Sequence, residues 1–287
     1  MRERINVVGN LAKDIIDGNE QFGGSAANIA IGLRRLGLNV GILSVLGKDE
    51  FSSSFRIFLE DAGVDTSLIQ RQLDILPVCE VFSNSNTNMG RRWFDNGCRA
   101  AMEQLIIKPE QFKGSLVHIV SCPPTLSSAF LHGGLDISYE PGPMLVFSSN
   151  YFDPRVAEES LFIFLNKEEL EIVSRLGQGI REDSYDYRHL KALIITLGER
   201  GSMLITRSGT QFLRHNIPPI SIPQDEILDF TGAGDNYKAG FLAGFIYGKS
   251  LIECAQIGSE MGAACIKYRG GLLPKAEVER IKSKHLF

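Results

Sequence analysis

The chain has 287 residues, of which 44% are hydrophobic and 22% charged, a balance ordinary for a globular protein with a substantial core. Its formal net charge of −4 gives no electrostatic reason to expect nucleic acid as a partner. No apolar run approaches the roughly 20 residues that span a bilayer, so we expect no membrane partner either. The five cysteines are scattered without a Cys-x-x-Cys pair, which argues against a zinc site or a disulfide framework. Met1 leads into a strand-like run without a signal-peptide pattern, and we expect a cytoplasmic protein.

Strand-like and helical apolar runs alternate along the chain. This alternation predicts βα units around a mostly parallel sheet that is covered on both faces. Without a repeat or a low-complexity linker, residues 1–287 are expected to form one main domain. The runs are residues 6–8, 27–36, 40–45, 51–62, 116–120, 145–147, 161–165, 193–196 and 203–206, followed by a long helix from Asp235.

One region interrupts this alternation. The segments 77–82 and 91–94 flank residues 83–90, which are rich in Asn and Ser. This pattern predicts a β-hairpin with a polar tip. A hairpin inside an α/β chain is often a small appendage that lies over the functional site.

The stretch from Gly23 to Gly37 begins with two glycines and continues as a small-residue helix. Adjacent glycines allow the backbone to approach a ligand closely, and Asn28 in the first turn could point toward the same ligand. The alternative needs no ligand: a tight turn before a core helix.

Asn166 and Glu169 follow an apolar strand and lie on one face of a helix's first turn. Both side chains offer oxygen atoms that suit Mg²⁺ or its waters. The alternative is a capping box, in which the same two side chains bond the helix's own backbone.

The segment from Asp229 to Asp235 combines small residues with the start of the long helix. The amides around Gly232, Ala233 and Gly234 can face one anion together, and the helix dipole adds to the attraction. A carboxylate beside an anion site makes sense if Asp235 accepts a proton from an attacking hydroxyl. A capped helix start is the alternative.

The segment Asp229–Asp235 closely resembles the C-terminal signature of the ribokinase-like, or PfkB, family of carbohydrate and nucleoside kinases. Residues 23–37 are similar to the N-terminal signature, and residues 45–51 to its continuation. The resemblance implies an α/β fold, a ribokinase-like three-layer sandwich with a mostly parallel central sheet. It also implies a small β lid from about residues 10–23 and 75–97. Because only eight residues separate Asp14 from Gly23, we expect a reduced lid.

The resemblance implies an ATP-dependent kinase that uses ATP and Mg²⁺. Gly232, Ala233 and Gly234 would hold the transferred phosphate, and Asp235 would activate the hydroxyl. Phe230 stands where a small polar residue is common, a departure that should matter little if its side chain points into the protein. The hydroxyls of the substrate would be contacted by Asn10, Asp14, Gly23, Gly24 and Asn28, with Asp17 as a weaker alternative to Asp14.

On the nucleotide side, residues 196–201 resemble the family's nucleotide-binding turn, and residues 166–169 match its Asn-x-x-Glu motif. The implied nucleotide-binding residues are Thr196, Gly198 and Gly201. Asn166 and Glu169 would support Mg²⁺ through water, while Asp229 and Thr231 lie near a site that holds a monovalent cation such as K⁺ in many relatives.

The acceptor is expected to be a small sugar or sugar-like polyol, with a nucleoside as the alternative. Residues 94–98 and 138–143 look like segments of the nucleoside-kinase branch, although Glu140 stands where Asp is usual. A sugar- or nucleotide-binding regulator without catalysis is a third interpretation, and relatives allow a homodimer. Residues 243–250 fit a permissive P-loop pattern, but we interpret them as a helix end with Gly248 as its cap.

Overall fold

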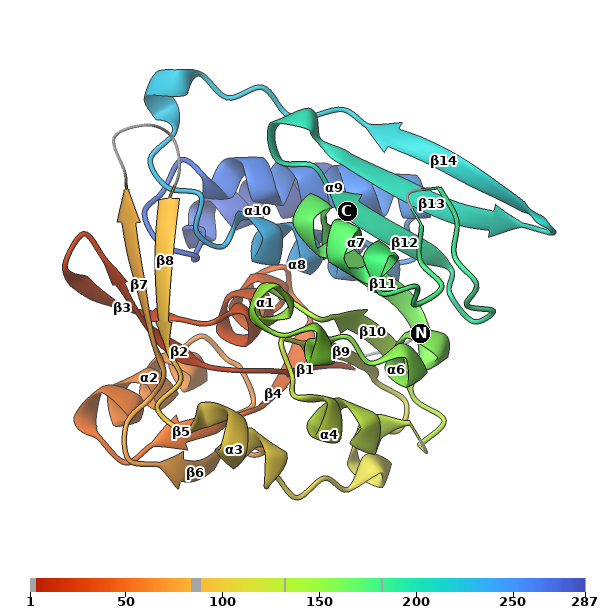
Figure 1. The fold of residues 1–287 in the computed structure, drawn as a ribbon. Helices are drawn as coiled ribbons and strands as arrows, with labels where there is room; N and C mark the ends of the chain where they lie inside the picture. The colour runs from red at the N-terminus through yellow and green to blue at the C-terminus, as the bar shows by residue number, and fades with distance from the viewer. Residues whose placement is uncertain (1–3, 84–88, 132, 182, 287) are drawn as a thin grey trace.

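A computed structural model describes residues 4–83, 89–131, 133–181 and 183–286. Within these ranges the main sheet has eight strands, ordered β14-β13-β12-β11-β10-β9-β1-β4 (Figure 1). The strands from β4 to β12 in this order are parallel, whereas β13 and β14 pair antiparallel at one edge. Their bounds are β1 Arg4–Val8, β4 Asn39–Leu43, β9 Leu116–Val120, β10 Asp136–Glu140, β11 Ser160–Asn166, β12 Ala192–Thr196, β13 Ser202–Ser208 and β14 Gln211–Ile217.

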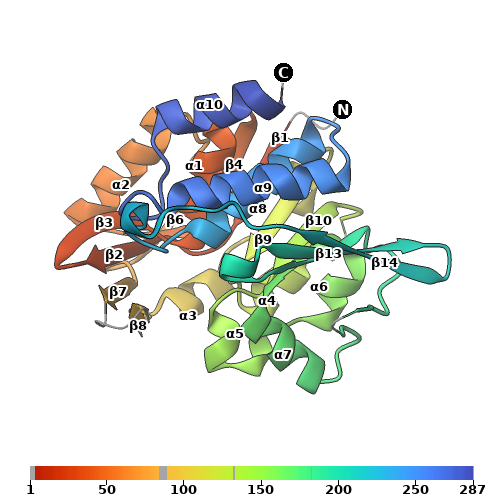
Figure 2. The same ribbon diagram turned by 90° about the horizontal axis from the view of Figure 1, so that it is seen from above.

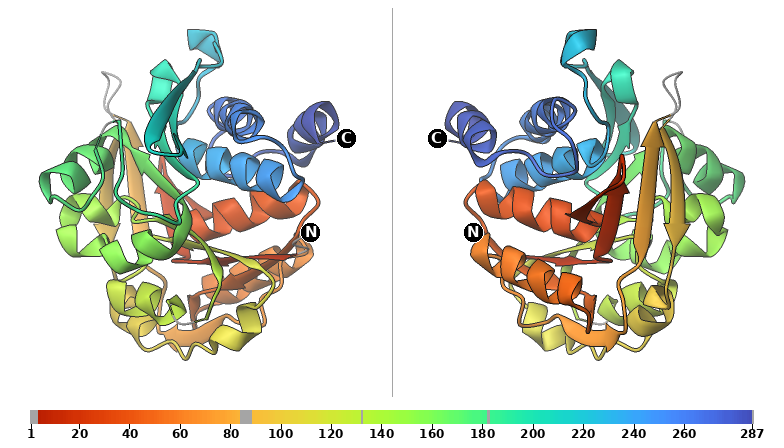
Figure 3. Two further views of the ribbon diagram at one scale, coloured as in Figure 1. Left: turned by 90° about the vertical axis from the view of Figure 1, so that its right-hand side faces the viewer. Right: turned by 90° about the vertical axis from the view of Figure 1, so that its left-hand side faces the viewer.

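Helices cover both faces of this sheet, which gives three layers (Figure 2). One face carries α1 (Ser25–Arg35), α8 (Ala233–Ile246), α9 (Leu251–Cys265) and α10 (Lys275–His285). Helix α2 (Glu50–Asp61) lies on the opposite side of the sheet from α1 (Figure 3). The other face carries α4 (Pro124–Ser127), α5 (Met144–Phe147), α6 (Pro154–Glu159) and α7 (Lys167–Arg175), and the short α3 (Cys98–Glu103) packs beside α4. Short 3₁₀ helices are η1 Pro109–Phe112, η2 Ser128–Phe130, η3 Ser149–Tyr151, η4 Gly198–Arg200 and η5 Gln224–Glu226. The predicted α/β class is confirmed.

A second sheet stands at one side of the main sheet (Figures 1 and 3). It contains β2 (Ala12–Ile16), β3 (Asn19–Gly23), β7 (Val78–Ser83) and β8 (Met89–Phe94) in the order β3-β2-β7-β8. Strands β7 and β8 pair antiparallel, so the predicted hairpin is confirmed, although most of its predicted tip (residues 84–88) lies outside the described residues. Strands β5 (Val45–Gly47) and β6 (Gln70–Leu73) form a separate parallel pair.

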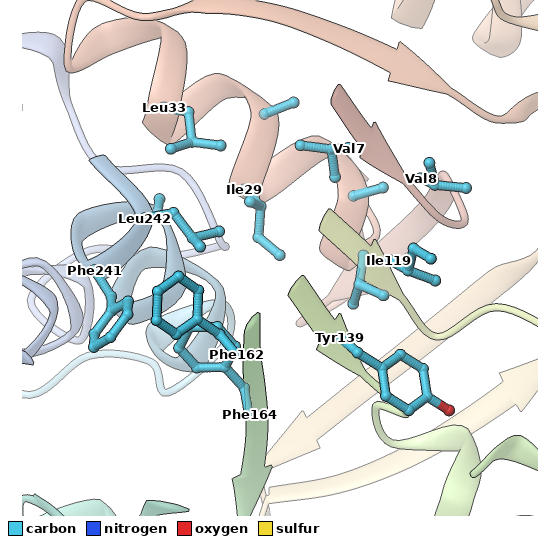
Figure 4. Close-up of a cluster of buried hydrophobic side chains, with 14 of the residues drawn as sticks. Val7, Val8, Ile29, Leu33, Ile119, Tyr139, Phe162, Phe164, Phe241 and Leu242 are labelled. Atoms are coloured by element: carbon cyan, nitrogen blue, oxygen red, sulfur yellow. The ribbon is translucent and has the colours of Figure 1, made fainter. Parts of the chain in front are cut away.

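Helix α8 is buried because it is apolar on almost every side. Phe241 packs against Phe162 and Phe164 of β11, with ring centroids 5.3 Å apart in both pairs (Figure 4). On the opposite side of the helix, Gly240 allows α9 to approach, since a Cβ atom there would lie only 2.9 Å from the Ile257 carbonyl oxygen. This packing fixes the start of α8 relative to the ends of the sheet strands.

Two details differ from the expectations drawn from sequence. The run at residues 145–147 belongs to the short helix α5, and the strand of this unit is β10, which precedes it. Strand β10 is less obvious in sequence because it ends in the charged residue Glu140. The rejected P-loop pattern is indeed the end of α8, followed by Gly248 at φ 78°.

Candidate active site

Several polar residues gather at the carboxyl edge of the main sheet. Asn10 follows β1, Ser121 follows β9, and Glu140, Asn166 and Thr196 end β10, β11 and β12. In open α/β sheets, ligands bind outside this edge, because the strands end there and loops replace them. The topology therefore brings together residues separated by nearly the whole chain.

The glycine turn before α8 is held rigidly. Gly232 has φ 74°, and a Cβ atom there would lie 2.3 Å from the Gly271 Cα, so only glycine fits. Asn236 Nδ2 donates to the carbonyl oxygens of Gly232 (2.9 Å) and Gly271 (2.8 Å). The first amides of α8 have no carbonyl partner within the helix, as at every helix start, and can face an anion.

Asp229 ties this turn to the loop after α9. Its Oδ1 accepts from the Thr231 amide and its Oδ2 from the Gly270 amide, both at 2.8 Å. Both oxygens of this carboxylate therefore bind backbone amides. Phe230, which follows Asp229, is 49% exposed, so its side chain does not point into the protein.

Asp235 lies in the first turn of α8 and is 9% exposed. Asn28 Nδ2, from α1, donates to Asp235 Oδ2 at 2.9 Å. Lys238 Nζ lies 3.7 Å from Asp235 Oδ1. One oxygen of the carboxylate is thus bound by Asn28, which is remote in sequence. The other faces Lys238, which lies one helical turn further along α8.

A cavity opens beside Asp235. The loop after β1, strand β2 and helix α1 supply polar groups to its wall, whereas strands β7 and β8 and the start of α5 supply apolar side chains. The indole Nε1 of Trp93 is buried without a hydrogen-bond partner among the described residues. The lining residues are Asn10, Ala12, Asp14, Gly24, Ser25, Asn28, Cys79, Val81, Trp93, Ser121, Pro143, Met144, Thr231, Gly232 and Asp235.

Four of the five residues expected to bind substrate line this cavity, and Gly23 is the exception. A Cβ atom at Gly23 would lie 2.0 Å from Asp14 Oδ2, so this glycine leaves room for the Asp14 carboxylate. Asp17 is placed differently from Asp14: it lies in the turn after β2 and pairs with Arg269. The geometry therefore favours Asp14 over Asp17 as a cavity residue.

At the end of β11, Asn166 and Glu169 form the capping box that was the alternative interpretation. Asn166 Oδ1 accepts from the Glu169 amide and Glu169 accepts from the Asn166 amide, both at 2.9 Å. Burial raises the pKa of the Glu169 carboxyl. The capping box fixes both side chains at the end of β11. Thr196 lies next to them, because it pairs in register with Asn166 across β11 and β12.

The turn after β12 closes through a hydrogen bond from the Leu197 amide to the Gly201 carbonyl oxygen, at 2.8 Å. Gly198 has φ 60°, and Gly201 has φ 82°. A Cβ atom at Gly201 would lie 2.2 Å from the Ile217 carbonyl oxygen, so packing against the end of β14 accounts for this glycine. Gly198 has open space around it and faces no such constraint.

Sequence reasoning did not single out Ser121 or Lys238. Ser121 has φ 51°, which is uncommon for a residue with a side chain, and its buried Oγ has no partner among the described residues. Its position directly after a parallel strand could have identified it. The same cavity also contains two other buried oxygens without partners, Asn28 Oδ1 and Thr231 Oγ1. Groups of this kind are suited to bind a polar ligand.

Lys238 and Glu140 form a buried ion pair behind Asp235. Lys238 Nζ lies 2.5 Å from Glu140 Oε1, and the two residues are 8% and 4% exposed. Burial raises the pKa of Glu140, whereas the positive charge of Lys238 acts in the opposite direction and favours the carboxylate. Burial alone would lower the pKa of Lys238, but Glu140 and Asp235 together raise it. Lys238 therefore keeps its positive charge.

No group of three or more His, Cys, Asp or Glu side chains could hold a metal ion within the part of the chain that the structure describes. In the same described part, no helix is both long and apolar enough to cross a membrane.

The rigid amide turn, the buried carboxylate beside it and the adjoining cavity define a site of the phosphotransferase class. Residues 5–277 match the model of the pfkB family carbohydrate kinases. The chain therefore belongs to the PfkB family, whose members are ATP-dependent kinases. The ribokinase-like fold expected from the sequence is confirmed by the solved structures described next.

Relatives with different acceptors in their names resemble this chain. A nucleoside kinase of Methanocaldococcus jannaschii is 29% identical over 93% of this chain and 92% of its own length. A 2-dehydro-3-deoxygluconokinase of Escherichia coli is 25% identical over 96% and 98%. The structure of a Burkholderia thailandensis nucleoside kinase in complex with inosine superposes with a TM-score of 0.82, at 22% identity over 98% of each chain. Thermotoga maritima ribokinase reaches 0.80, at 18% identity over 97% of this chain and 99% of its own.

Proposed function

We propose that this kinase transfers the γ-phosphoryl group of ATP to a hydroxyl of a nucleoside. The observation that carries the proposal is the two kinds of wall in the cavity beside Asp235. Asp14, Asn10 and Asn28 offer partners for ribose hydroxyls, while Trp93 and Met144 offer apolar surface of the kind on which a base stacks. A free sugar has little surface that would use the second wall.

This proposal reverses the order expected from the sequence, which placed a free sugar or polyol first. The relative named nucleoside kinase, similar over nearly the whole chain, supports the change. The inosine complex of a protein with the same fold shows that the fold can hold a nucleoside. The unpartnered indole Nε1 of Trp93 would give the base a hydrogen-bond donor.

In the proposed reaction, Asp235 accepts the proton of the attacking hydroxyl while Asn28 keeps the carboxylate in place. The hydroxyl oxygen forms a bond to the γ-phosphorus, and the bond to the departing ADP oxygen breaks in line. The amides of residues 232–234 stabilise the charge on the transferred group. Bound Mg²⁺ would neutralise charge on the nucleotide, with Asn166 and Glu169 as its nearest candidates, through water. Thr196 and Gly198 would adjoin the nucleotide phosphates or ribose.

A sugar kinase is the second candidate, because the polar wall alone would suffice for an acceptor rich in hydroxyls. The relative named 2-dehydro-3-deoxygluconokinase supports it. We further propose a reducing, cytoplasmic location, since all five cysteines are free. Activation by K⁺ near Asp229 and Thr231 and formation of a homodimer stay predictions, which assays with KCl against NaCl and sedimentation would test.

The test is ADP release from ATP and Mg²⁺ across a panel of nucleosides, free sugars and sugar acids, with Asp235→Asn as the inactive control. We expect turnover with at least one nucleoside at a kcat/KM at least tenfold above that of any sugar. Turnover with sugars alone would overturn the nucleoside proposal in favour of the second candidate. Binding of ATP without turnover on any acceptor would favour the non-catalytic interpretation.

A further inference from the structure

Helix α8 contains a buried cation that the reaction described above does not use. Lys238 is 8% exposed in a helix that is otherwise largely apolar around it. Side chains on a helix lean toward its N-terminus, so the ammonium group lies back beside the first turn. Its Nζ is 3.7 Å from Asp235 Oδ1 and 3.5 Å from the place where a Cβ atom of Gly234 would be.

This is an unfavourable place for a positive charge in the free protein. The amides at a helix N-terminus repel cations, and burial removes water from the ammonium group. The carboxylates of Glu140 and Asp235 offset both effects and raise the pKa of Lys238 above its ordinary value, against burial. Glu169, on α7, acts in the same direction.

A purely structural role for the ion pair between Lys238 and Glu140 explains this arrangement poorly. A buried ion pair is weak support for stability, because desolvation of both charges opposes their attraction. Glu140 Oε2 has no hydrogen-bond partner among the described residues, and the nearest charged or titratable group on β9 is His118, 4.0 Å away. Burial lowers the pKa of His118 to about 3, so this ring is neutral and does not balance Glu140. The pair is thus incompletely satisfied as a structural element.

We propose that Lys238 is a positioning residue for phosphoryl transfer. Glu140 fixes its ammonium group, which then holds the Oδ1 side of Asp235 and places one positive charge next to the amide turn at Gly234. Lys238 stays protonated throughout, since the proton of the acceptor moves to Asp235. Lys238 is not among the residues that line the cavity, so it acts through Asp235 and through its charge. The inference rests on the proposed kinase site but not on the choice of acceptor.

The test asks whether the charge of Lys238 is needed for catalysis or only for stability. It removes each partner of the Lys238–Glu140 pair alone and then both together. Wild type, Lys238→Met, Glu140→Gln and the double variant are compared by thermal midpoint, kcat and KM. Lys284→Met is the matched control. It removes an ammonium group on α10 whose Nζ lies 2.7 Å from Glu260 Oε2, away from the site. Lys284→Met should leave kcat unchanged.

We expect Lys238→Met to lower both the thermal midpoint and kcat, because it leaves Glu140 buried and unpaired. The double variant should regain most of the thermal midpoint, yet its kcat should stay about 10- to 100-fold below wild type, the size typical for loss of one electrostatic contact in a transition state. Its KM for the acceptor should change by less than about threefold, since the contact is used mainly in the transition state. Recovery of kcat together with the thermal midpoint would overturn the proposal and leave a structural pair.

The acceptor used is whichever one the wild type turns over, so a sugar-specific enzyme would end the nucleoside proposal and still decide the role of Lys238. If no acceptor is turned over, binding of ADP, Mg²⁺ and aluminium fluoride, which imitates the phosphoryl group in transfer, decides instead. Wild type should bind ADP at least about tenfold more tightly with aluminium fluoride, and the double variant should lose that gain. Equal gains in both proteins, or no gain in wild type, would overturn the inference.

Discussion

The two sheets contribute to the site in different ways. At the edge of the main sheet, Asp235, Asn28 and Glu140 are almost fully buried and are held by contacts between α1, α8 and β10. The second sheet contributes Val81 and Trp93 from a hairpin that joins the rest of the sheet through the pairing of β2 with β7. Groups in the core can keep a fixed geometry, whereas a hairpin at the side can change its surface without disturbing the core.

The anchoring of the second sheet supports this division. Strand β3 is attached to α2 by Phe22, whose ring stacks on Phe55 with centroids 4.6 Å apart. At the other edge of the sheet, Phe94 of β8 is 42% exposed. The sheet is therefore firmly packed at its β3 edge and more exposed at its β8 edge. We infer that the reaction is set by the main sheet and that the acceptor is selected by the hairpin.

The largest expected effect belongs to the main-sheet edge. Asp235→Asn should lower kcat by about 10³-fold, within the range for loss of a general base, because the amide cannot accept the proton. The binding of ATP should change by less than about threefold, since no nucleotide contact is removed. Single-turnover assays and calorimetry would measure the two quantities. Activity close to that of wild type would show that the base lies elsewhere.

A smaller and more selective effect is expected for the hairpin. Trp93→Ala should raise KM for a nucleoside about 10- to 100-fold, the equivalent of one lost stacking contact, with kcat changed far less. Steady-state kinetics with a nucleoside would measure it, and Phe94→Ala on the same strand is the matched control, because Phe94 does not line the cavity. An unchanged KM would place the base away from the second sheet and would remove the contrast between the two sheets.

The smallest expected effect on catalysis lies outside both regions. Glu260 of α9 binds Arg280, Lys284 and His285 of α10 at 2.6 to 3.0 Å. Burial works against these hydrogen bonds, yet they hold the pKa of Glu260 at about 2, below its ordinary 4.5. Because the pKa is lower in the folded state, this carboxylate stabilises the fold above pH 4.5, and the contribution is lost as the pH falls toward 2.

Glu260→Gln should therefore reduce the free energy of unfolding at pH 7 by about 1 to 2 kcal/mol, after allowance for solvent around the partly exposed partners. The difference from wild type should shrink as the pH falls below 4.5. Denaturant unfolding at several pH values would measure it, and kcat at 25 °C should stay unchanged. A large loss of kcat would show that the α9–α10 contact reaches the active site.

Interactions between residues close together in the sequence determined many of the local structural features of this protein. The small residues before Asp235 specified a tight turn into a helix, and Asn166 with Glu169 specified a helix start, because both features depend on neighbours along the chain. The alternation of strands and helices indicated the α/β class. The hairpin of β7 and β8 was also predictable, since residues typical of turns separate two strand-like segments.

Only the tertiary structure decided which distant groups meet. Nothing local in the sequence indicates that Asn28 bonds Asp235, that Glu140 pairs with Lys238, or that Gly23 makes room for Asp14, because each pair joins separate elements through the packing of the sheet. Tertiary packing also decided that Phe230 is exposed, which the sequence left open. Short-range propensity selects the elements, but the shared edge of the parallel strands assembles the site.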